Sequence, residues 1–208
     1  MAHKGVLFLD ELPEFHRDVI EALRQPMEEG KIQIARAQGS VTFPADFILV
    51  TASNPCPCGF LGDEEKECQC TPSMILKYRR KLSGPILDRI DLKVNVPRTP
   101  FEKLILKEEP EKTEEISQKI IEARKIQKER GVLNGRMPLR EIKKYCQIQK
   151  EGEELLKEAM RKLALSPRAF HKILKVSRTI ADLEGKIEIE TKHIAEALEY
   201  QEREGDFF

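Results

Sequence analysis

The sequence lacks the overall charge and the apolar runs that would assign it to a membrane or polyelectrolyte class. Lysine plus arginine and aspartate plus glutamate both number 36 among 208 residues, so the formal net charge is zero. Such a balance implies no general attraction to nucleic acid or to a membrane surface, and any such binding must be local. No apolar run approaches the roughly 18 residues of a membrane span. The first residues form neither a signal peptide nor a basic transit segment, so we expect a cytoplasmic protein without a membrane partner.

The sequence also lacks a phosphate-binding loop. No stretch matches G-x-x-x-x-G-K-[ST], the segment whose backbone N–H groups cradle the phosphates of a nucleotide. Other signals of phosphate chemistry are present, and a sheet that carries them normally begins with an earlier strand and such a loop. We therefore expect these 208 residues to be a fragment of a longer protein, whose N-terminal portion is missing here.

The most informative stretch is Gly5–Leu12, with the sequence GVLFLDEL. Its four consecutive apolar residues, Val6 to Leu9, are too few for a buried helix and typical of a parallel strand covered on both faces. Asp10 and Glu11 follow at the carboxyl end, where open α/β sheets bind their ligands. This pattern is typical of a Walker B motif, in which the first carboxylate holds magnesium and the second activates water. The alternative is an ordinary strand followed by an acidic helix N-terminus.

The following segments continue an α/β pattern. Apolar residues at helical spacing predict one helix over 13–29 that ends near Gly30; they are Phe15, Val19, Leu23 and Met27. Alternating residues predict a β-hairpin with strands at 31–36 and 41–43, and a second buried strand follows at 47–51. We also expect a helix at 72–82 and a strand at 92–96.

Two polar residues in this half are candidate site residues. Asn54 follows the strand at 47–51, at a place where an amide can position water or contact a phosphate. Alternatively, Asn54 and Pro55 form only a turn. Arg89 belongs to an Asp-Arg pair between apolar residues. It suits a solvated helix end, and equally an arginine directed at the nucleotide of a neighbouring subunit.

The second half of the chain is helical and highly charged. Pro97 and Pro100 favour an extended connection, so we place the domain boundary between residues 98 and 99. Helices are predicted at 113–130, 138–145, 153–163, 166–183 and 190–202. Ser166 followed by Pro167 is a strong helix start signal. A succession of short helices without a strand pattern predicts a helical bundle.

Four of the five cysteines form two Cys-x-Cys pairs, namely Cys56, Cys58, Cys68 and Cys70. Four thiolates suit tetrahedral zinc in a closed structural site, although two to four residues usually separate paired ligands. A redox pair and reduced loop thiols are the alternatives. Without a signal peptide, a zinc site in a reducing compartment is favoured over disulfides. Cys146 stands alone in a predicted helix and is expected in the core.

The order of these motifs resembles a known family. VLFLDE, a helix, a hairpin, ILVTASNP and GPILDRIDL follow one another as in the AAA+ ATPase core from Walker B to the arginine finger. NPCPCG with a later Cys-x-Cys resembles the magnesium-chelatase-like AAA+ ATPases of the YifB or ComM type. The segments EARKIQKER and SPRAFHKILKVSRTIADLEG resemble the carboxyl-terminal domain of the same family. The resemblance therefore covers nearly the whole chain.

The resemblance implies a fold and an activity. The expected fold class is α/β followed by all-α. Residues 1–98 would be the later part of an AAA+ core with a pre-sensor-1 hairpin, and residues 99–208 its helical lid. The intact protein is expected to be a hexameric ATPase that uses ATP and Mg²⁺ and couples hydrolysis to DNA branch migration. The fragment itself is expected to be inactive, because it lacks the phosphate loop.

The resemblance also implies roles for individual residues. Asp10 and Glu11 correspond to Walker B, with Asp10 as the magnesium ligand. Asn54 corresponds to sensor 1 and Arg89 to the arginine finger. Arg168 corresponds to sensor 2, which reaches the γ-phosphate from the lid. The alternative for Arg168 is a solvated arginine near a helix start, a position that the helix dipole mildly disfavours.

Three further interpretations remain open. Lys31 and Arg36 lie on the predicted hairpin and can contact a DNA backbone in the channel of a ring, although basic residues are common on any surface. The chain also resembles the motor subunits of magnesium chelatase, which drive metal insertion into a porphyrin, but the Cys-x-Cys pairs argue against that function. Finally, the isolated fragment can be a non-catalytic assembly module.

Overall fold

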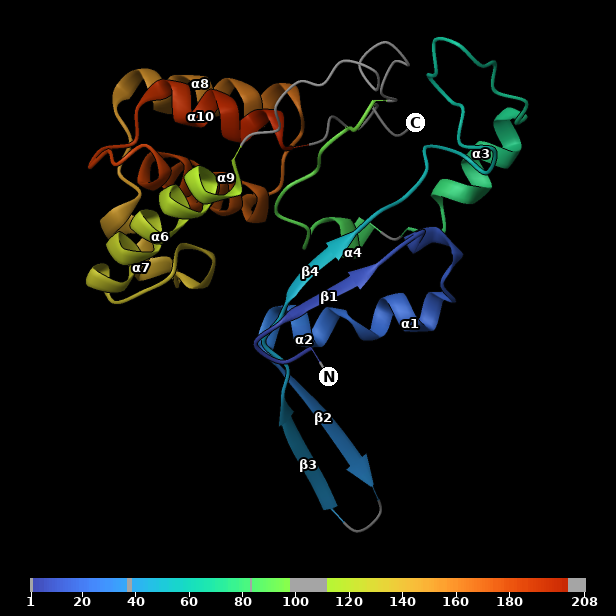
Figure 1. The fold of residues 1–208 in the computed structure, drawn as a ribbon, viewed down its shortest axis with the longest axis horizontal. Helices are drawn as coiled ribbons and strands as arrows, with labels where there is room; N and C mark the ends of the chain where they lie inside the picture. The colour runs from blue at the N-terminus through green and yellow to red at the C-terminus, as the bar shows by residue number, and fades with distance from the viewer. Residues whose placement is uncertain (1, 37–38, 83, 98–111, 202–208) are drawn as a thin grey trace. The chain divides into compact units, whose positions relative to one another are not determined.

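The computed structural model describes residues 2–36, 39–82, 84–97 and 112–201. These residues fall into two compact units (Figure 1), an α/β unit over residues 1–90 and a helical unit over residues 91–204. The domain boundary predicted between residues 98 and 99 lies outside the described residues. Each unit is described by itself below.

Two parallel strands form the centre of the α/β unit (Figure 1). β1 (Val6–Leu9) pairs with β4 (Ile48–Thr51) in register, with Val6 opposite Ile48 and Leu9 opposite Thr51. A small apolar cluster covers one side of the pair. It consists of Leu12, Ile20 and Ile86, with Leu9, Leu23, Met27 and Leu82 packed against them. Both predicted strands are confirmed.

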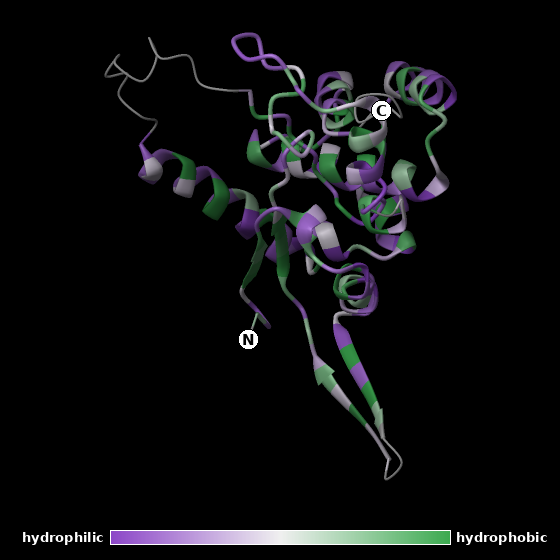
Figure 2. Cartoon of the chain, turned by 90° about the vertical axis from the view of Figure 1, so that its right-hand side faces the viewer, coloured by the Kyte–Doolittle hydropathy of each residue, from purple (hydrophilic) through white to green (hydrophobic). Residues whose placement is uncertain are grey.

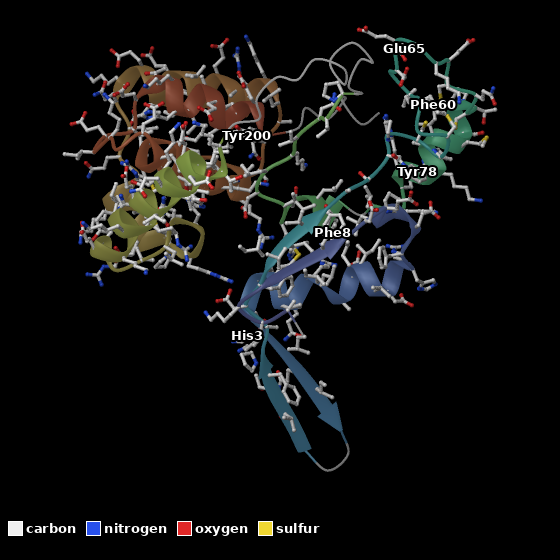
Figure 3. The ribbon with its side chains drawn as sticks, in the orientation of Figure 1. His3, Phe8, Phe60, Glu65, Tyr78 and Tyr200 are labelled. Atoms are coloured by element: carbon white, nitrogen blue, oxygen red, sulfur yellow. The ribbon has the colours of Figure 1, made fainter. Side chains whose placement is uncertain are left out.

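The other face of the strand pair is open. Val6, Phe8, Ile48 and Val50 share this face, and their exposed fractions are 57%, 58%, 64% and 43%. Figure 2 shows the apolar colouring of the strands, and Figure 3 labels Phe8. The expectation of a strand covered on both faces is therefore wrong for the described residues, since more than half of Phe8 remains accessible to solvent.

The single helix predicted over 13–29 is interrupted. The structure has a 3-10 turn η1 (Leu12–Glu14), then α1 (Arg17–Ala22) and α2 (Arg24–Glu29). Pro26 explains the break between the two helices, because it has no N–H to donate to the carbonyl of Ala22. The buried residue of α1 is Ile20, whereas Val19 is half exposed. α2 ends as predicted at Gly30, whose φ of 65° is left-handed.

The predicted hairpin is confirmed. β2 (Lys31–Arg36) and β3 (Gly39–Pro44) form an antiparallel pair that extends beyond the β1–β4 pair (Figure 1). Residues 37 and 38, between the two strands in the sequence, lie outside the described residues. Ile32 stands opposite Phe43 and Ile34 opposite Val41, and all four side chains are at least 41% exposed.

The rest of the α/β unit contains two short helices. α3 (Pro72–Arg79) confirms the helix predicted at 72–82, and α4 (Gly84–Leu87) precedes Arg89. The strand predicted at 92–96 is wrong, because residues 92–96, which fall in the helical unit, form no β-ladder. In this segment, the Lys93 N–H donates to the Tyr200 carbonyl at 3.2 Å.

The helical unit confirms the predicted succession of helices. They are α6 (Thr113–Arg130), α7 (Leu139–Tyr145), α8 (Lys150–Lys162), α9 (Pro167–Leu183) and α10 (Thr191–Glu199), with a 3-10 turn η2 (Asn134–Arg136). Ser166 caps α9 by accepting the Ala169 N–H at 3.2 Å. None of the described helices combines the length and apolar composition needed to cross a bilayer.

The core of the helical unit is continuous. Its buried apolar residues come from every helix but α6 and include Ile142, Cys146, Leu156, Ile173 and Ile194. A buried polar network lies beside it. Asp182 accepts hydrogen bonds from Arg130 at 2.7 and 3.0 Å, from Arg178 at 3.0 Å and from Asn134 at 2.7 Å. This network ties α6 and η2 to α9.

Candidate functional site

The candidate nucleotide-site residues of the α/β unit follow the ends of β1 and β4. The Ala52 N–H donates to the Leu9 carbonyl, and the Leu12 N–H donates to the Ala52 carbonyl, each at 3.0 Å. These two bonds extend the strand pairing past Thr51. Since the strands are parallel, the segments that carry Asp10, Glu11 and Asn54 leave the sheet at the same edge.

Glu11 has an unusual backbone conformation. Its φ and ψ of 50° and 51° lie in the left-handed region, which costs a non-glycine residue of the order of 1–3 kcal/mol. The Asp10 carboxylate accepts the Glu11 N–H at 3.0 Å and supports this turn. Both acidic side chains are exposed. Exposed carboxylate oxygens suit a hydrated Mg²⁺ ion, which keeps several of its waters when it binds protein.

Asn54 lies near residues of two later segments. The hydroxyl of Tyr78, a buried residue of α3 that Figure 3 labels, is next to the backbone amide of Asn54. Burial raises the pKa of Tyr78, and the carboxylates of Glu14 and Glu11 raise it further. Gly59 also approaches the Asn54 side chain. Tyr78 therefore belongs to the site, although only its place in a predicted helix was visible in the sequence.

Arg89 lies after α4 and has an intramolecular partner. Its guanidinium donates to the Glu28 carboxylate at 2.6 Å and to the Pro85 carbonyl, and its side chain is 10% exposed. Glu28 is at the end of α2, 61 residues earlier, so no local sequence pattern predicts the pair. Within one chain, the candidate arginine finger is therefore held by a carboxylate.

The other predicted site residues belong to other elements of the chain. Arg168 is exposed in the first turn of α9, in the helical unit. Lys31 and Arg36 are the first and last residues of β2. The Lys31 ammonium lies 3.5 Å from the Glu29 carboxylate. The hairpin thus carries its two basic residues at opposite ends of one strand.

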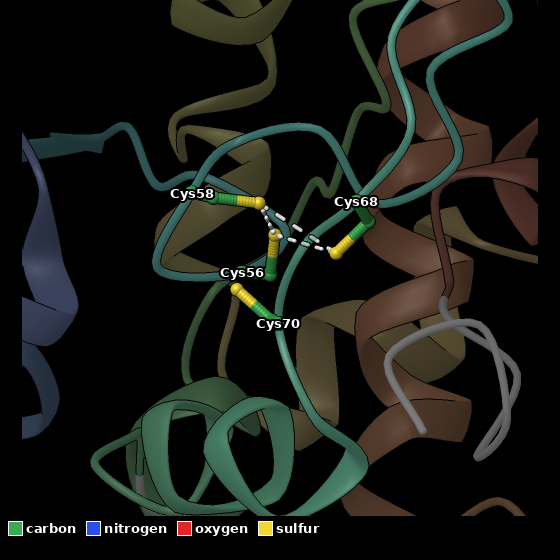
Figure 4. Close-up of side chains that lie close together, drawn as sticks. All are labelled: Cys56, Cys58, Cys68 and Cys70. Atoms are coloured by element: carbon green, nitrogen blue, oxygen red, sulfur yellow. Dashed lines mark hydrogen bonds between the residues drawn. The ribbon is translucent and has the colours of Figure 1, made fainter.

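The four cysteines of the two Cys-x-Cys pairs come together (Figure 4). The sulfur atom of Cys56 lies 3.4 Å from that of Cys58 and 3.7 Å from that of Cys68, and Cys58 lies 3.6 Å from Cys68. With Cys70, all four lie within 4.8 Å of one another. A tetrahedral metal with bonds of about 2.3 Å to sulfur requires edges of about 3.8 Å. The cluster, hereafter the four-cysteine centre, therefore has the size of a metal site.

The thiols of this centre differ in their tendency to ionise. The pKa of Cys58 is lowered to about 6, chiefly because the backbone N–H of Phe60 bonds its sulfur. Desolvation raises the pKa of Cys70 to about 12. Four neighbouring thiolates repel one another, and a divalent cation between them removes that repulsion. Cys146, the fifth cysteine, is buried in the helical core as predicted.

Comparison with protein families identifies the class to which the α/β unit and the helical unit belong. Residues 1–104 match the family model for magnesium chelatase, subunit ChlI. Residues 110–201 match the model for the C-terminal part of the same subunit. The chain belongs to the magnesium chelatase family.

The similar curated proteins come from several bacteria. The competence protein ComM of Haemophilus influenzae is 46% identical over 97% of this chain. The uncharacterized proteins YifB of Salmonella typhimurium and Rv2897c of Mycobacterium tuberculosis are 41% and 34% identical over the same share. In each case the chain spans 40% of the relative's own length. The similarity to YifB and ComM proteins expected from the motifs is confirmed.

Proposed function

We propose that this chain is part of a magnesium-chelatase-like AAA+ ATPase, cytoplasmic and ring-forming, that couples ATP hydrolysis to DNA remodelling. The observation that carries the proposal is the common edge at which Asp10, Glu11 and Asn54 leave two paired parallel strands. Asp10 would hold Mg²⁺, which neutralises charge on the phosphates. Glu11 would take the proton of the attacking water, and Asn54 would orient that water.

A longer polypeptide completes this site. The chain spans 40% of its curated relatives, and the open face of β1 and β4 is apolar. Parallel strands are normally covered on both faces, so a further layer of the intact protein is expected there. The phosphate loop would come from the same missing portion. The 208-residue chain by itself is therefore expected to show no ATP turnover.

Two arginines complete the proposed mechanism. Arg89 of one subunit would stabilise charge on the phosphoryl group bound by another, and Arg168 would contact the γ-phosphate from the lid. The Glu28 carboxylate that holds Arg89 within one chain would have to release it in the ring. Arg89→Ala in the intact protein is expected to lower the hydrolysis rate by roughly 10³ to 10⁵.

Glu11→Gln in the intact protein tests the proposal directly. The amide cannot accept a proton, so hydrolysis should fall by roughly 10² to 10⁴ while ATP binding persists. Glu14→Gln is the matched control. Glu14 lies three residues later, is exposed and pairs with Lys81 at 3.1 Å. Hydrolysis that persists in Glu11→Gln, or falls equally in both variants, would show that Glu11 is not the base.

DNA is proposed as the substrate of the motor, with the β2–β3 hairpin as a contact. The hairpin supports this because it extends away from the strand pair and carries Lys31 and Arg36. Backbone contacts release counterions, so Lys31→Ala and Arg36→Ala should each reduce the salt dependence of DNA binding by about one unit of slope. An unchanged slope in both variants excludes the hairpin.

Zinc is the proposed occupant of the four-cysteine centre, because sulfur ligands at tetrahedral spacing suit it. Elemental analysis of protein purified without added metal should find close to one zinc per chain. A protein that contains no metal and whose four cysteine thiols react with a thiol reagent would exclude a zinc site.

A motor for porphyrin metallation is the second candidate function, favoured by the two magnesium chelatase family models that match the chain. The ATPase rate of the intact protein separates the candidates. Stimulation by DNA supports the first, and stimulation by a porphyrin with its chelatase partners supports the second.

A further inference from the structure

The first cysteine of the four-cysteine centre lies two residues after Asn54, the candidate water-positioning residue. Asn54 is separated from Cys56 by Pro55 alone, and the ring of Pro55 restricts the rotation of the backbone between them. Cys56 is fully buried, and its sulfur contacts those of Cys58 and Cys68. Any movement of Cys56 is therefore transmitted to Asn54 through a stiff connection.

The turn that contains the first two cysteines also lies against the Asn54 side chain. The Gly59 N–H donates to the Cys56 carbonyl at 3.0 Å, which closes the turn. Gly59 adopts a left-handed φ of 82°, and a Cβ at this position would lie 4.0 Å from both Cγ and Oδ1 of Asn54. The Asn54 amide thus lies near the turn that contains Cys56 and Cys58.

The second pair of cysteines reaches Asn54 from the other direction. Thr71 follows Cys70 directly and caps α3, with its hydroxyl accepting the Met74 N–H at 3.3 Å. On α3, the Tyr78 hydroxyl lies next to the backbone amide of Asn54. The two halves of the centre are therefore connected to the same residue, one through the Gly59 turn and one through Tyr78.

We infer that a metal ion in the four-cysteine centre positions Asn54, so that the occupancy of the centre controls the hydrolytic site. The inference rests on the proposed function. The loop between the cysteine pairs, residues 59–67, is mostly polar, and the Lys66 ammonium lies 4.0 Å from the centre of the Phe60 ring. Without the ion, contacts between sulfur atoms and backbone hydrogen bonds to sulfur join the two pairs, and sulfur is a weak acceptor. When the ion is bound, the Gly59 turn and the segment that leads to Tyr78 are both anchored to one rigid centre.

The side-chain amide signals of the isotope-labelled 208-residue chain test this inference without any nucleotide. The sequence contains three asparagines, Asn54, Asn95 and Asn134. When a chelator removes zinc, the Asn54 amide pair should shift by more than its line width or broaden beyond detection, and zinc should restore it. Asn134 is the internal control, because it is bonded to Asp182 and Thr179 in the helical unit and should not shift.

Two variants sharpen the test. Cys68→Ser removes one ligand and should give the metal-free Asn54 signal even with zinc present. Cys146→Ser is the matched control, since Cys146 lies in the helical core and should leave zinc content and Asn54 unchanged. The backbone signals of Leu12 and Ala52, which report the pairing at the strand ends, should persist in both variants.

Three results would overturn the inference. They are an Asn54 signal that does not respond to zinc loss, a chain that takes up no metal, and loss of the Leu12 and Ala52 signals together with that of Asn54. The third would mean that the metal holds the whole α/β unit folded. The catalytic proposal is tested separately by Glu11→Gln, so the two can fail independently. In the intact protein, zinc removal should lower the hydrolysis rate and leave the affinity for ATP unchanged.

Discussion

The α/β unit and the helical unit place their apolar side chains differently. In the helical unit, residues of α7 to α10 form one continuous core, and a buried network surrounds Asp182. In the α/β unit, the main cluster has only three buried members, while the apolar face of β1 and β4 and the hairpin residues Ile32 and Phe43 are exposed.

This difference indicates which unit is complete. A two-stranded sheet covered by a small cluster on one face buries less apolar surface than a bundle with a closed core. We therefore expect the helical unit to unfold as an independent cooperative unit. The α/β unit should unfold in a separate transition, and a layer over its open strand face should stabilise it.

Among substitutions that should change the difference in stability between the two units, Asp182→Ala is expected to have the largest effect. Removing this carboxylate leaves Arg178 buried without its anionic partner, and Arg130 loses its bidentate contact. Loss of one partner of a buried ion pair costs about 3–5 kcal/mol. Urea unfolding should show that the free energy of unfolding of the helical unit falls by that amount. Calorimetry should show that the transition of the α/β unit is unchanged.

The control for this variant is Glu158→Ala. Glu158 pairs with Lys162 on the surface of α8, and both side chains are more than half exposed. Solvent screens such a pair, so no measurable change is expected. Equal destabilisation by both variants would contradict the importance given to the buried network.

A smaller effect is expected from Gly152→Ala on α8. A Cβ at this position would lie 2.6 Å from the Cδ1 atom of Ile194, so the buried Ile194 side chain or the two helices must shift. Overpacking costs typically 1–3 kcal/mol, and the better helix propensity of alanine offsets up to about 1 kcal/mol. Gly135→Ala, with no atom within 4 Å of its Cβ, is the matched control. Destabilisation in the control alone would contradict the close packing of α8 on α10.

The smallest effect in this chain is expected from Phe8→Ser on the open face. More than half of Phe8 is already accessible, so the free energy of unfolding should change by less than about 0.5 kcal/mol. In the intact protein, the same substitution should destabilise the α/β core strongly, because the ring would be covered there. Equal effects in the two proteins would mean that no further layer covers this face.

Local signals predicted much of this fold. The Ser166–Pro167 cap, Gly30 at the end of α2 and the alternation over Lys31–Arg36 all lead to the structure observed. Each acts over a few residues of backbone, so its effect does not depend on the rest of the chain. The same is true of Asp10 and Glu11, whose place after β1 follows from the length of that strand.

Other features depended on contacts between distant segments. The break between α1 and α2 was visible in principle from Pro26, but the choice of Ile20 over Val19 as the buried residue was not. The pairing of Arg89 with Glu28 and the contact of Tyr78 with Asn54 join residues of separate elements. The strand expected at 92–96 had the right composition and no partner strand among the described residues.

The amino-acid sequence by itself determined the kinds of element, their order, and the residue types available for metal and phosphate chemistry, because these depend on propensity and spacing along the chain. Only the tertiary structure decided that four sulfur atoms converge, that Tyr78 lies next to Asn54, and that one face of β1 and β4 stays open. Such outcomes depend on which surfaces find a partner in space, and spacing along a chain does not encode that choice.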